Sequence, residues 1–193
     1  MIVPSVVLSL CFVVIGAAPA LGERQGKPVQ GPETFTANAQ VKGAAGAAAT
    51  TLRIQIDRYT PDFDRKSVEE ALKTGGYPKF LTALRQAPVV GNVAMGEKQF
   101  AIRYARQQST PKGRTISIVT DQPVFFVGGG ATNAKPRAGY EVAVLQFSVD
   151  EVGLGSGTMA AAARVRPGGD AGVQIDDYGS EPIDLVTVSK VIK

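Results

Sequence analysis

The chain has 193 residues, no histidine, no tryptophan, one cysteine and a formal net charge of +4. This length suits one domain with a sizeable core. Because the single cysteine lies in an apolar N-terminal run, the rest of the chain excludes histidine-dependent catalytic triads and the usual zinc and copper sites. We expect no cofactor and no metal. Basic residues stand singly along the chain, which favours a solvated surface, and we expect no nucleic-acid partner.

Residues 1–20 are predicted to be a signal peptide that is removed on export. No charged side chain precedes Glu23, and Ala18-Pro19-Ala20 supplies the small residues that a signal peptidase recognises. The first residues depart from the usual pattern because they contain no Lys or Arg. We therefore expect a periplasmic or extracellular protein with no stable membrane span after signal removal. A flexible tether is expected over residues 21–33.

Two alternatives to cleavage are weaker. An uncleaved anchor would need a longer apolar run than residues 2–18, and Pro4 interrupts this one. A lipid anchor on Cys11 would need a small residue directly before the cysteine, where the chain has Leu10. Export with removal of the segment is therefore the first interpretation.

Residues 34–193 are predicted to form one β-rich domain. The stretch FTANAQVK (35–42) is its first expected strand. The stretch TLRIQIDR (51–58) places Leu52, Ile54 and Ile56 on one face and polar residues on the other, as in a half-buried strand. The small-residue tract between them, KGAAGAAATT, is expected to be a hairpin loop or a close-packed edge.

The alternation of apolar and polar residues that is typical of strands stops at about residues 64–87, where we predict an insertion of two short helices. The first helix is expected to end at Gly75-Gly76 and to have an apolar face made of Val68, Ala71 and Leu72. The second begins at Tyr77-Pro78 and is stopped by Pro88, and its apolar stripe comprises Phe80, Leu81, Leu84 and Ala87.

Strand patterns return after the insertion. In QFAIRYAR (99–106) we expect Phe100, Ile102 and Tyr104 to point inward, and RTISIVT (114–120) should form a hairpin with it. The stretch YEVAVLQFSV (140–149) is apolar on both faces, as in a central strand. Further strands are expected in DQPVFFV, TMAAAARVR, GVQID and DLVTVSKVI. The turn spacing predicts a mainly β fold, an antiparallel β-barrel or sandwich with a two-helix insertion between early strands.

Two motifs suggest chemistry, but their contexts favour turns. The stretch GSGTMA (155–160) matches a dinucleotide fingerprint, and Asp176 follows at a suitable distance, yet no parallel βαβ unit precedes it. Alternation continues through it, with Met159, Ala161, Ala163 and Val165 expected on one face, so we interpret it as part of a hairpin. The stretch STPK (109–112) matches S-x-x-K, but Pro111 and Gly113 indicate a hairpin tip.

Carboxylates are the remaining candidates for chemistry. A hydrolase would need two of them to flank a cleft, and the sequence does not show which converge among Asp57, Asp62, Asp64, Glu141 and Asp150. A calcium site would draw on Asp170, Asp176, Asp177 and Glu181, but these lack the order of a calcium-binding loop. No catalytic residue is predicted.

The string GGYPKFLTALRQAPVVGNV, the strand IRYAR and the strand GRTISIVTDQP together resemble a set of small exported bacterial β-rich proteins of uncharacterised function. The resemblance spans about residues 50–193. It implies export and a β-rich domain, and it implies no activity, ligand or catalytic residue. The matching residues are Arg103, Tyr104, Arg106, Asp121 and Pro123, and their simplest interpretation is an Arg to Asp contact between neighbouring strands.

Three functions follow as hypotheses. The first is an exported non-enzymatic β-domain that binds a small apolar or amphipathic ligand under the helical insertion, with Tyr77, Phe80, Leu84 and Tyr104 as ligand-binding residues. The alternative is a purely structural role, in which the helices only close or cover the barrel and bind no ligand. The second hypothesis is an envelope protein-protein interaction or structural module, and the third is a carboxylate-dependent hydrolase. An apolar cavity, an exposed apolar patch or two converging carboxylates would separate them.

Overall fold

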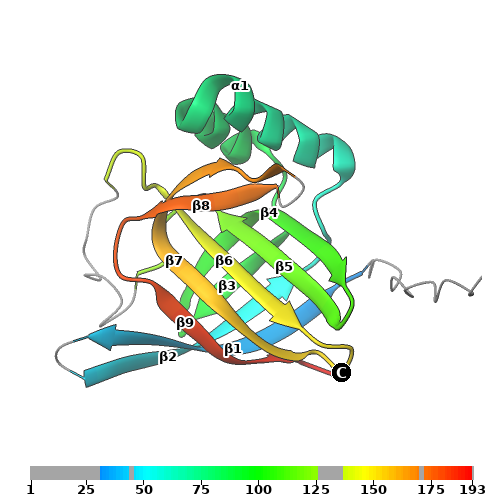
Figure 1. The fold of residues 1–193 in the computed structure, drawn as a ribbon, viewed down its shortest axis with the longest axis vertical. Helices are drawn as coiled ribbons and strands as arrows, with labels where there is room; N and C mark the ends of the chain where they lie inside the picture. Colours follow the sequence, from blue (N-terminus) through cyan, green and yellow to red (C-terminus); the bar gives the residue numbers. More distant parts are fainter. Residues whose placement is uncertain (1–30, 44–45, 126–136, 170–171, 193) are drawn as a thin grey trace, which may run out of the picture.

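The computed structural model describes residues 31–43, 46–125, 137–169 and 172–192. The predicted signal peptide and most of the predicted tether lie outside these ranges. The described residues form nine strands and one helix, coloured along the chain in Figure 1. The elements are β1 Glu33–Gly43, β2 Gly46–Ile56, α1 Asp62–Gln86, β3 Gly91–Met95, β4 Lys98–Thr110, β5 Gly113–Thr120, β6 Val142–Val149, β7 Leu154–Pro167, β8 Val173–Tyr178 and β9 Ile183–Lys190.

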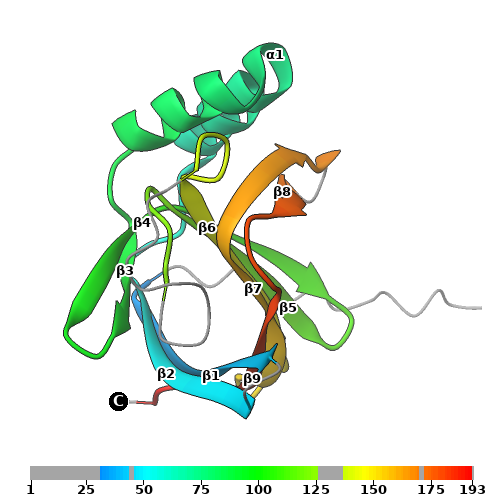
Figure 2. The same cartoon turned by 90° about the vertical axis from the view of Figure 1, so that its left-hand side faces the viewer.

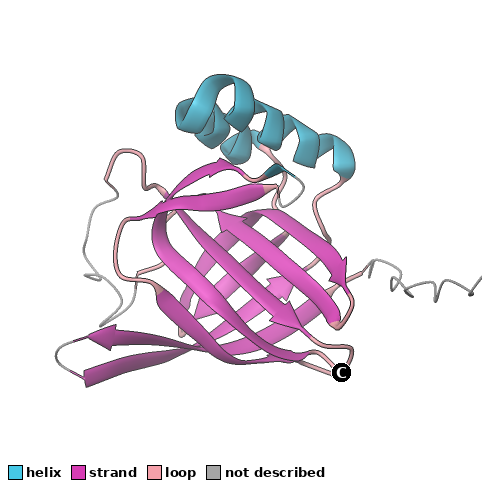
Figure 3. Ribbon diagram, in the orientation of Figure 1, coloured by secondary structure: helices cyan, strands magenta, loops and turns pink. Residues whose placement is uncertain are grey.

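The strands close into an antiparallel barrel. Their order is β6-β5-β4-β3-β2-β1-β9-β7, and β6 pairs with β7, which joins the two ends of the sheet. Eight strands therefore surround one interior (Figure 3). The remaining strand, β8, pairs with the second part of β7, while β9 pairs with the first part. The structure thus confirms the predicted mainly β fold and selects the barrel over the sandwich.

The barrel interior is filled by one cluster of apolar side chains, which we call the inner core. Alternation along the strands supplies it, because every second residue of a strand points to the same side. The predicted inward face of β2 is confirmed, since Leu52, Ile54 and Ile56 are fully buried there. The rings of Phe35 and Phe147 meet edge to face, with centroids 5.3 Å apart.

Helix α1 packs on the outside of the barrel wall, not over its mouth (Figures 1 and 2). The side chains between the helix and the wall form a second cluster, which we call the outer core. The wall contributes residues that alternate with inner-core residues, such as Val119 on β5 and Val144 on β6. This explains why β6 is apolar on both faces. The outer core comprises Val68, Leu72, Phe80, Leu84, Ala87, Tyr104, Val119, Val142, Val144, Ala160, Ala163, Val165 and Val173.

The prediction of two helices is wrong, because the insertion is one helix, α1, with a kink. Only Gly76 leaves helical geometry, at φ 63° and ψ −162°, a conformation open to glycine. The helix resumes directly after it. Pro78 then stands near the start of the second segment, where a missing N–H costs little. The glycine pair therefore bends the helix instead of ending it.

Two bulges reverse predicted side-chain directions. The pairing of β4 with β5 shifts between Ile102 and Tyr104, so Tyr104 points outward into the outer core and Ala105 points inward. The pairing of β6 with β7 shifts between Val142 and Val144. As a result Met159 and Ala161 belong to the inner core, whereas Ala163 and Val165 belong to the outer core. A bulge adds one residue to a strand, which exchanges its two faces.

Two smaller predictions have different outcomes. The strand expected in DQPVFFV is absent from its described part, residues 121–125, although Val124 is fully buried and donates its N–H to the Ala161 carbonyl at 2.8 Å. The fingerprint GSGTMA lies in β7, as the hairpin interpretation requires. A Cβ on Gly155 or Gly157 would collide with a β6 carbonyl oxygen.

Within the described ranges, no helix is both long and apolar enough to cross a membrane.

Candidate functional site

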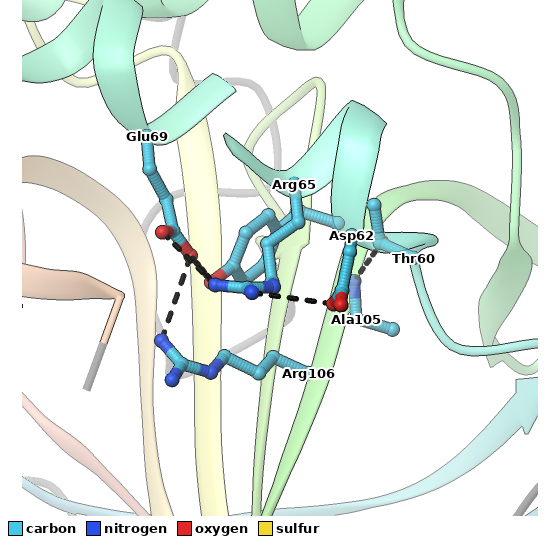
Figure 4. Close-up of polar contacts among 7 residues, drawn as sticks. Thr60, Asp62, Arg65, Glu69, Ala105 and Arg106 are labelled. Atoms are coloured by element: carbon cyan, nitrogen blue, oxygen red, sulfur yellow. Dashed lines mark hydrogen bonds and ion pairs between the residues drawn. The ribbon is translucent and has the colours of Figure 1, made fainter. Parts of the chain in front are cut away.

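A groove of about 610 Å³ lies where the chain leaves the barrel and begins α1. We call it the arginine groove because three arginines, Arg58, Arg65 and Arg106, stand in its wall. Figure 4 shows polar contacts in and beside the groove, among residues from the segment before α1, from the first turns of α1 and from β4. The other lining residues are Gly31, Tyr59, Thr60, Pro61, Asp62, Ala105 and Gln107.

Thr60 fixes the segment before α1 to β4. Its N–H donates to the Ala105 carbonyl at 2.9 Å, and its hydroxyl accepts the Ala105 N–H at 2.8 Å. Both hydrogen bonds satisfy buried backbone groups, which need partners because they are removed from water. Because the β4 bulge turns Ala105 inward, the next residue, Arg106, is directed outward into the groove. The bulge therefore places an arginine beside the start of the helix.

Glu69 is the buried acid that links α1 to β4. Its carboxylate accepts a hydrogen bond from the Tyr104 hydroxyl at 2.8 Å. Arg65, one turn earlier on α1, donates to both carboxylate oxygens at 3.1 to 3.2 Å and also reaches Asp62 at 3.2 Å. The Arg106 guanidinium lies 3.5 Å away (Figure 4). A buried carboxylate that accepts hydrogen bonds from two side chains and has a third cation nearby holds its neighbours in fixed positions.

The protonation states of this cluster follow from its geometry. Burial, and then the hydrogen bond to Glu69, raise the pKa of Tyr104 above its usual value of 10. Burial alone would lower the pKa of Arg65, but the carboxylates of Glu69 and Asp62 outweigh burial and raise the pKa. At neutral pH Tyr104 is therefore a neutral donor and Arg65 is a cation.

The turn between β7 and β8 covers this cluster at Gly172. A Cβ at this position would lie closer than 3.0 Å to the polar ends of Tyr104, Arg106 and Glu69, and the backbone has φ +75°. We expect Gly172→Ala to lower the free energy of unfolding by about 2 kcal/mol, from backbone strain and displacement of the cluster. Urea unfolding measures this change. Gly169→Ala is the matched control, since Gly169 has φ +57° with open space around it.

The control separates strain from contact. Gly169→Ala should cost only the left-handed backbone penalty, about 1 kcal/mol. If the two variants were equally stable, Gly172 would not be closing the cluster, and the packing of the turn against Glu69 would be refuted.

Arg58 and the part of Arg106 that lines the groove retain capacity to bind. The Arg106 Nη1 atom itself is buried under the turn at Gly172, 3.5 Å from Glu69, and has no hydrogen-bond partner among the described residues. The Arg58 side chain has no hydrogen bond or ion pair with any described residue, and it is exposed. Around the groove, three arginines face the carboxylates of Asp62 and Glu69. Positive charge and free donors remain, which suits a carboxylate or phosphate.

A second polar network, the Glu33 network, borders this groove. The Glu33 carboxylate accepts two bonds from Arg114 at 2.7 Å, one from Tyr59 at 2.7 Å and an ion pair from Lys190 at 2.7 Å. Arg114 also donates to Gln107 of the groove wall. Burial alone would raise the pKa of Glu33, but these donors outweigh it and lower the pKa to about 2. The network ties the first, middle and last strands together.

A second groove, of about 560 Å³, lies on the other side of Glu33. Its wall includes Val152 from the β6–β7 turn and Ile192 from the chain end, and these side chains are 69% and 86% exposed. Leu154 beside them is 54% exposed. The N–H of Lys190 donates to the Gly153 carbonyl at 2.8 Å, which holds the turn against the chain end. Three exposed apolar side chains therefore gather at one end of the barrel.

The four predicted ligand-binding residues lie together, but in the outer core. Phe80, Leu84 and Tyr104 are fully buried, and Tyr77 stacks beside Phe80 with ring centroids 6.0 Å apart. The Tyr77 hydroxyl accepts the Glu141 N–H at 2.8 Å. Of the four, only Tyr104 touches a group beside the arginine groove, through Glu69. Their role as a ligand site stays a prediction.

Five of the carboxylates considered for hydrolysis or calcium binding have other contacts. Asp62 pairs with Arg65, and Asp57 accepts a hydrogen bond from Gln55 at 2.8 Å. Asp150 caps the β6–β7 turn through two backbone N–H groups. Asp176 and Asp177 lie beside Arg164. The described residues contain no group of three or more acids, histidines or cysteines that could hold a metal ion.

Sequence reasoning found one contact of this region and missed its centre. The expected Arg to Asp contact between neighbouring strands is confirmed, since Arg103 donates to Asp121 at 2.9 Å. Glu69 was not singled out. Its spacing of four residues from Arg65 is the one signal that could have drawn attention to it.

Comparison with known proteins gives no function for this groove. Comparisons of the chain with protein-family models, with curated proteins and with solved structures found no match.

Proposed function

We propose that the protein is a non-enzymatic β-barrel domain that binds a small amphipathic anion in the arginine groove. The observation that carries the proposal is the set of three guanidinium groups in the groove wall, from Arg58, Arg65 and Arg106, which outnumber the one carboxylate of the lining, Asp62. A carboxylate or phosphate would pair with the exposed Arg58 side chain and with the part of Arg106 that lines the groove. Hydrogen bonds between a charged donor and a charged acceptor are stronger than neutral ones, so such a ligand gains affinity there.

The groove also offers apolar surface. The Tyr59 ring is half-buried and packs against the inner core, and Pro61 and Ala105 stand near it. A ligand with a charged head and a short apolar body would place the head at Arg58 and Arg106 and the body along these residues. We assign the outer core a supporting role, because Phe80 and Leu84 hold α1 against the barrel and so keep Arg65 and Glu69 in place.

The two segments of α1 on either side of Gly76 differ in what they contact. The first carries Asp62 and Arg65 in the groove wall, with Val68 and Leu72 in the outer core, whereas the second carries Phe80 and Leu84 in the outer core. Ligand contact would then belong to the first segment, while both segments anchor the helix. Export to the cell envelope is part of the proposal, as the N-terminal sequence and the resemblance suggest.

Decanoate is a suitable probe because it combines a carboxylate with an apolar chain. We expect the protein to bind decanoate in isothermal titration calorimetry and Arg106→Gln to weaken the binding by about tenfold or more, because a charge-assisted hydrogen bond is lost. Arg166→Gln is the matched control. It removes the same charge from an exposed arginine outside the groove and should change affinity less than twofold.

Several results would contradict the proposal. Absence of decanoate binding, or equal binding by Arg106→Gln with its circular dichroism unchanged, would remove the arginine groove as the site. Native mass spectrometry of protein from its own envelope, followed by lipid extraction, would identify the natural ligand. Recovery of a bound polypeptide in place of a small molecule would favour the second candidate function.

The second candidate is an envelope interaction module. It is favoured by the exposed apolar side chains of Val152, Leu154 and Ile192 at one end of the barrel. Exposed apolar side chains that gather in this way are typical of contact surfaces. A carboxylate-dependent hydrolase gains no support from the described contacts, because Asp62 pairs with Arg65, Asp57 accepts a hydrogen bond from Gln55 and Asp150 caps a turn.

A further inference from the structure

The arginine groove and the second groove border each other at the start of β1. Gly31 stands in the wall of the arginine groove, and Pro32, the next residue, stands in the wall of the second groove. The Tyr59 side chain lines the arginine groove, and its hydroxyl donates to Glu33 of the second groove at 2.7 Å. The border between the two grooves is therefore formed by the beginning of β1 and the Tyr59 side chain.

The two walls differ in charge. The arginine groove has three arginines against Asp62, whereas the second groove has Glu33 and Glu151 against Lys190. Glu33 and Lys190 pair with each other at 2.7 Å, which leaves the exposed carboxylate of Glu151 in excess. An anionic group is therefore attracted to the arginine groove and repelled from the second groove.

The second groove offers apolar surface instead. Val152 and Ile192 stand in its wall and are 69% and 86% exposed, and such side chains gain free energy when a hydrocarbon chain covers them. We infer that the ligand of the arginine groove is an anionic lipid with one long hydrocarbon chain, which passes over Tyr59 and Pro32 and lies along Val152 and Ile192. The inference rests on the proposed function and specifies the class of ligand.

The adjacency of the two grooves favours a lipid over a protein partner at the second groove. A protein that covered Val152 and Ile192 would leave the arginines of the neighbouring groove without a role. A single-chain anionic lipid has its charge at one end and its apolar surface along the rest, and the two grooves have the same order. One molecule can therefore satisfy both walls.

Fatty acids of two chain lengths test the inference. We expect myristate to bind about 30-fold or more tighter than decanoate in isothermal titration calorimetry below the micellar concentration, because its additional CH₂ groups are covered in the second groove. The double variant Val152→Asn, Ile192→Asn should bind myristate about tenfold more weakly, with decanoate affinity changed by less than about twofold. The protein is used in the form that its own cell produces.

Val89→Asn is the matched control. Val89 is 48% exposed and lies outside the walls of both grooves, so both affinities should stay unchanged. Equal affinities of the unaltered protein for decanoate and myristate would overturn the inference, as would a double variant that binds myristate like the unaltered protein. Either result leaves the arginine groove as the decanoate site. Absence of decanoate binding contradicts the proposed function, and the inference falls with it.

Discussion

Replacing Phe80 with alanine is expected to lower the free energy of unfolding by about 3 to 5 kcal/mol. The side chain is fully buried between α1 and the outer wall of the barrel, where it belongs to the outer core. Its removal leaves a cavity that the barrel wall cannot fill, because the wall is held by pairing on both edges of its strands. Guanidinium unfolding followed by circular dichroism measures the change.

Phe63→Ala is the matched control for this variant. Phe63 lies on the same helix and is 84% exposed, so the same change of residue should alter stability by less than about 0.5 kcal/mol. The comparison also bears on the predicted ligand role of Phe80. A small loss of stability, together with a bound molecule that disappears in Phe80→Ala, would place the side chain against a ligand and would contradict a packed outer core.

Replacing Glu33 with glutamine is expected to cost about 3 kcal/mol at neutral pH. The Glu33 side chain is 2% exposed, and its carboxylate is the shared counter-charge of Arg114 and Lys190. Glutamine keeps the shape but removes the charge, so the Arg114 guanidinium, itself 13% exposed, loses its only buried counter-charge among the described residues. Removing one partner of a buried ion pair is costly because the other charge stays buried.

The pH dependence of the free energy of unfolding gives a second test of how much Glu33 contributes to stability. Its folded pKa of about 2 lies below the ordinary value of 4.5, so its contribution is complete above pH 4.5. The contribution is lost as pH falls from 4.5 to about 2, where the carboxylate of the folded protein takes up a proton. The shift corresponds to about 3 kcal/mol. We therefore expect the unaltered protein to lose this stability over that range and Glu33→Gln to lose about 3 kcal/mol less.

The double variant Glu33→Gln, Arg114→Met separates the ion pair from general damage. If the loss in Glu33→Gln comes from an unpaired guanidinium, removing Arg114 as well should recover part of it, since no buried charge is left behind. Additive losses in the two single variants would contradict this account. So would a Glu33→Gln variant whose stability falls with acid as steeply as that of the unaltered protein.

The sequence predicted the strands well because their signal is local. Leu52, Ile54 and Ile56 alternate in the sequence and are buried together in the barrel. The same reasoning failed at Tyr104, since alternation carries no information about an inserted residue, and the bulge before it exchanges the two faces of β4. The apolar residues on both faces of β6 were a correct sign of a covered wall, but the helix that covers it could not be identified from β6 alone.

The candidate site was not predictable in the same way. Its parts meet through contacts between distant residues, such as Thr60 with Ala105 and Tyr104 with Glu69. Nothing in the local pattern of residues 60–69 distinguishes a buried glutamate from a solvated one on a helix. The glycine pair was identified as a break, but the sequence around it does not show that the helix continues. Pro78 is tolerated in the first turn of the second segment, and Phe80 holds that segment on the barrel.

The pairing of β1 with β9 has a consequence for how the chain folds. The first strand can close the barrel only after the last one is available, since Phe35 pairs with Lys190 and Gln40 with Asp184. Closure then joins segments from opposite ends of the chain, and such contacts form late because long loops must be ordered first. If the chain is exported, as proposed, the barrel is completed only after the C-terminal strand has crossed the membrane. The Glu33 network, which joins β1 to β9, would then form only after that crossing.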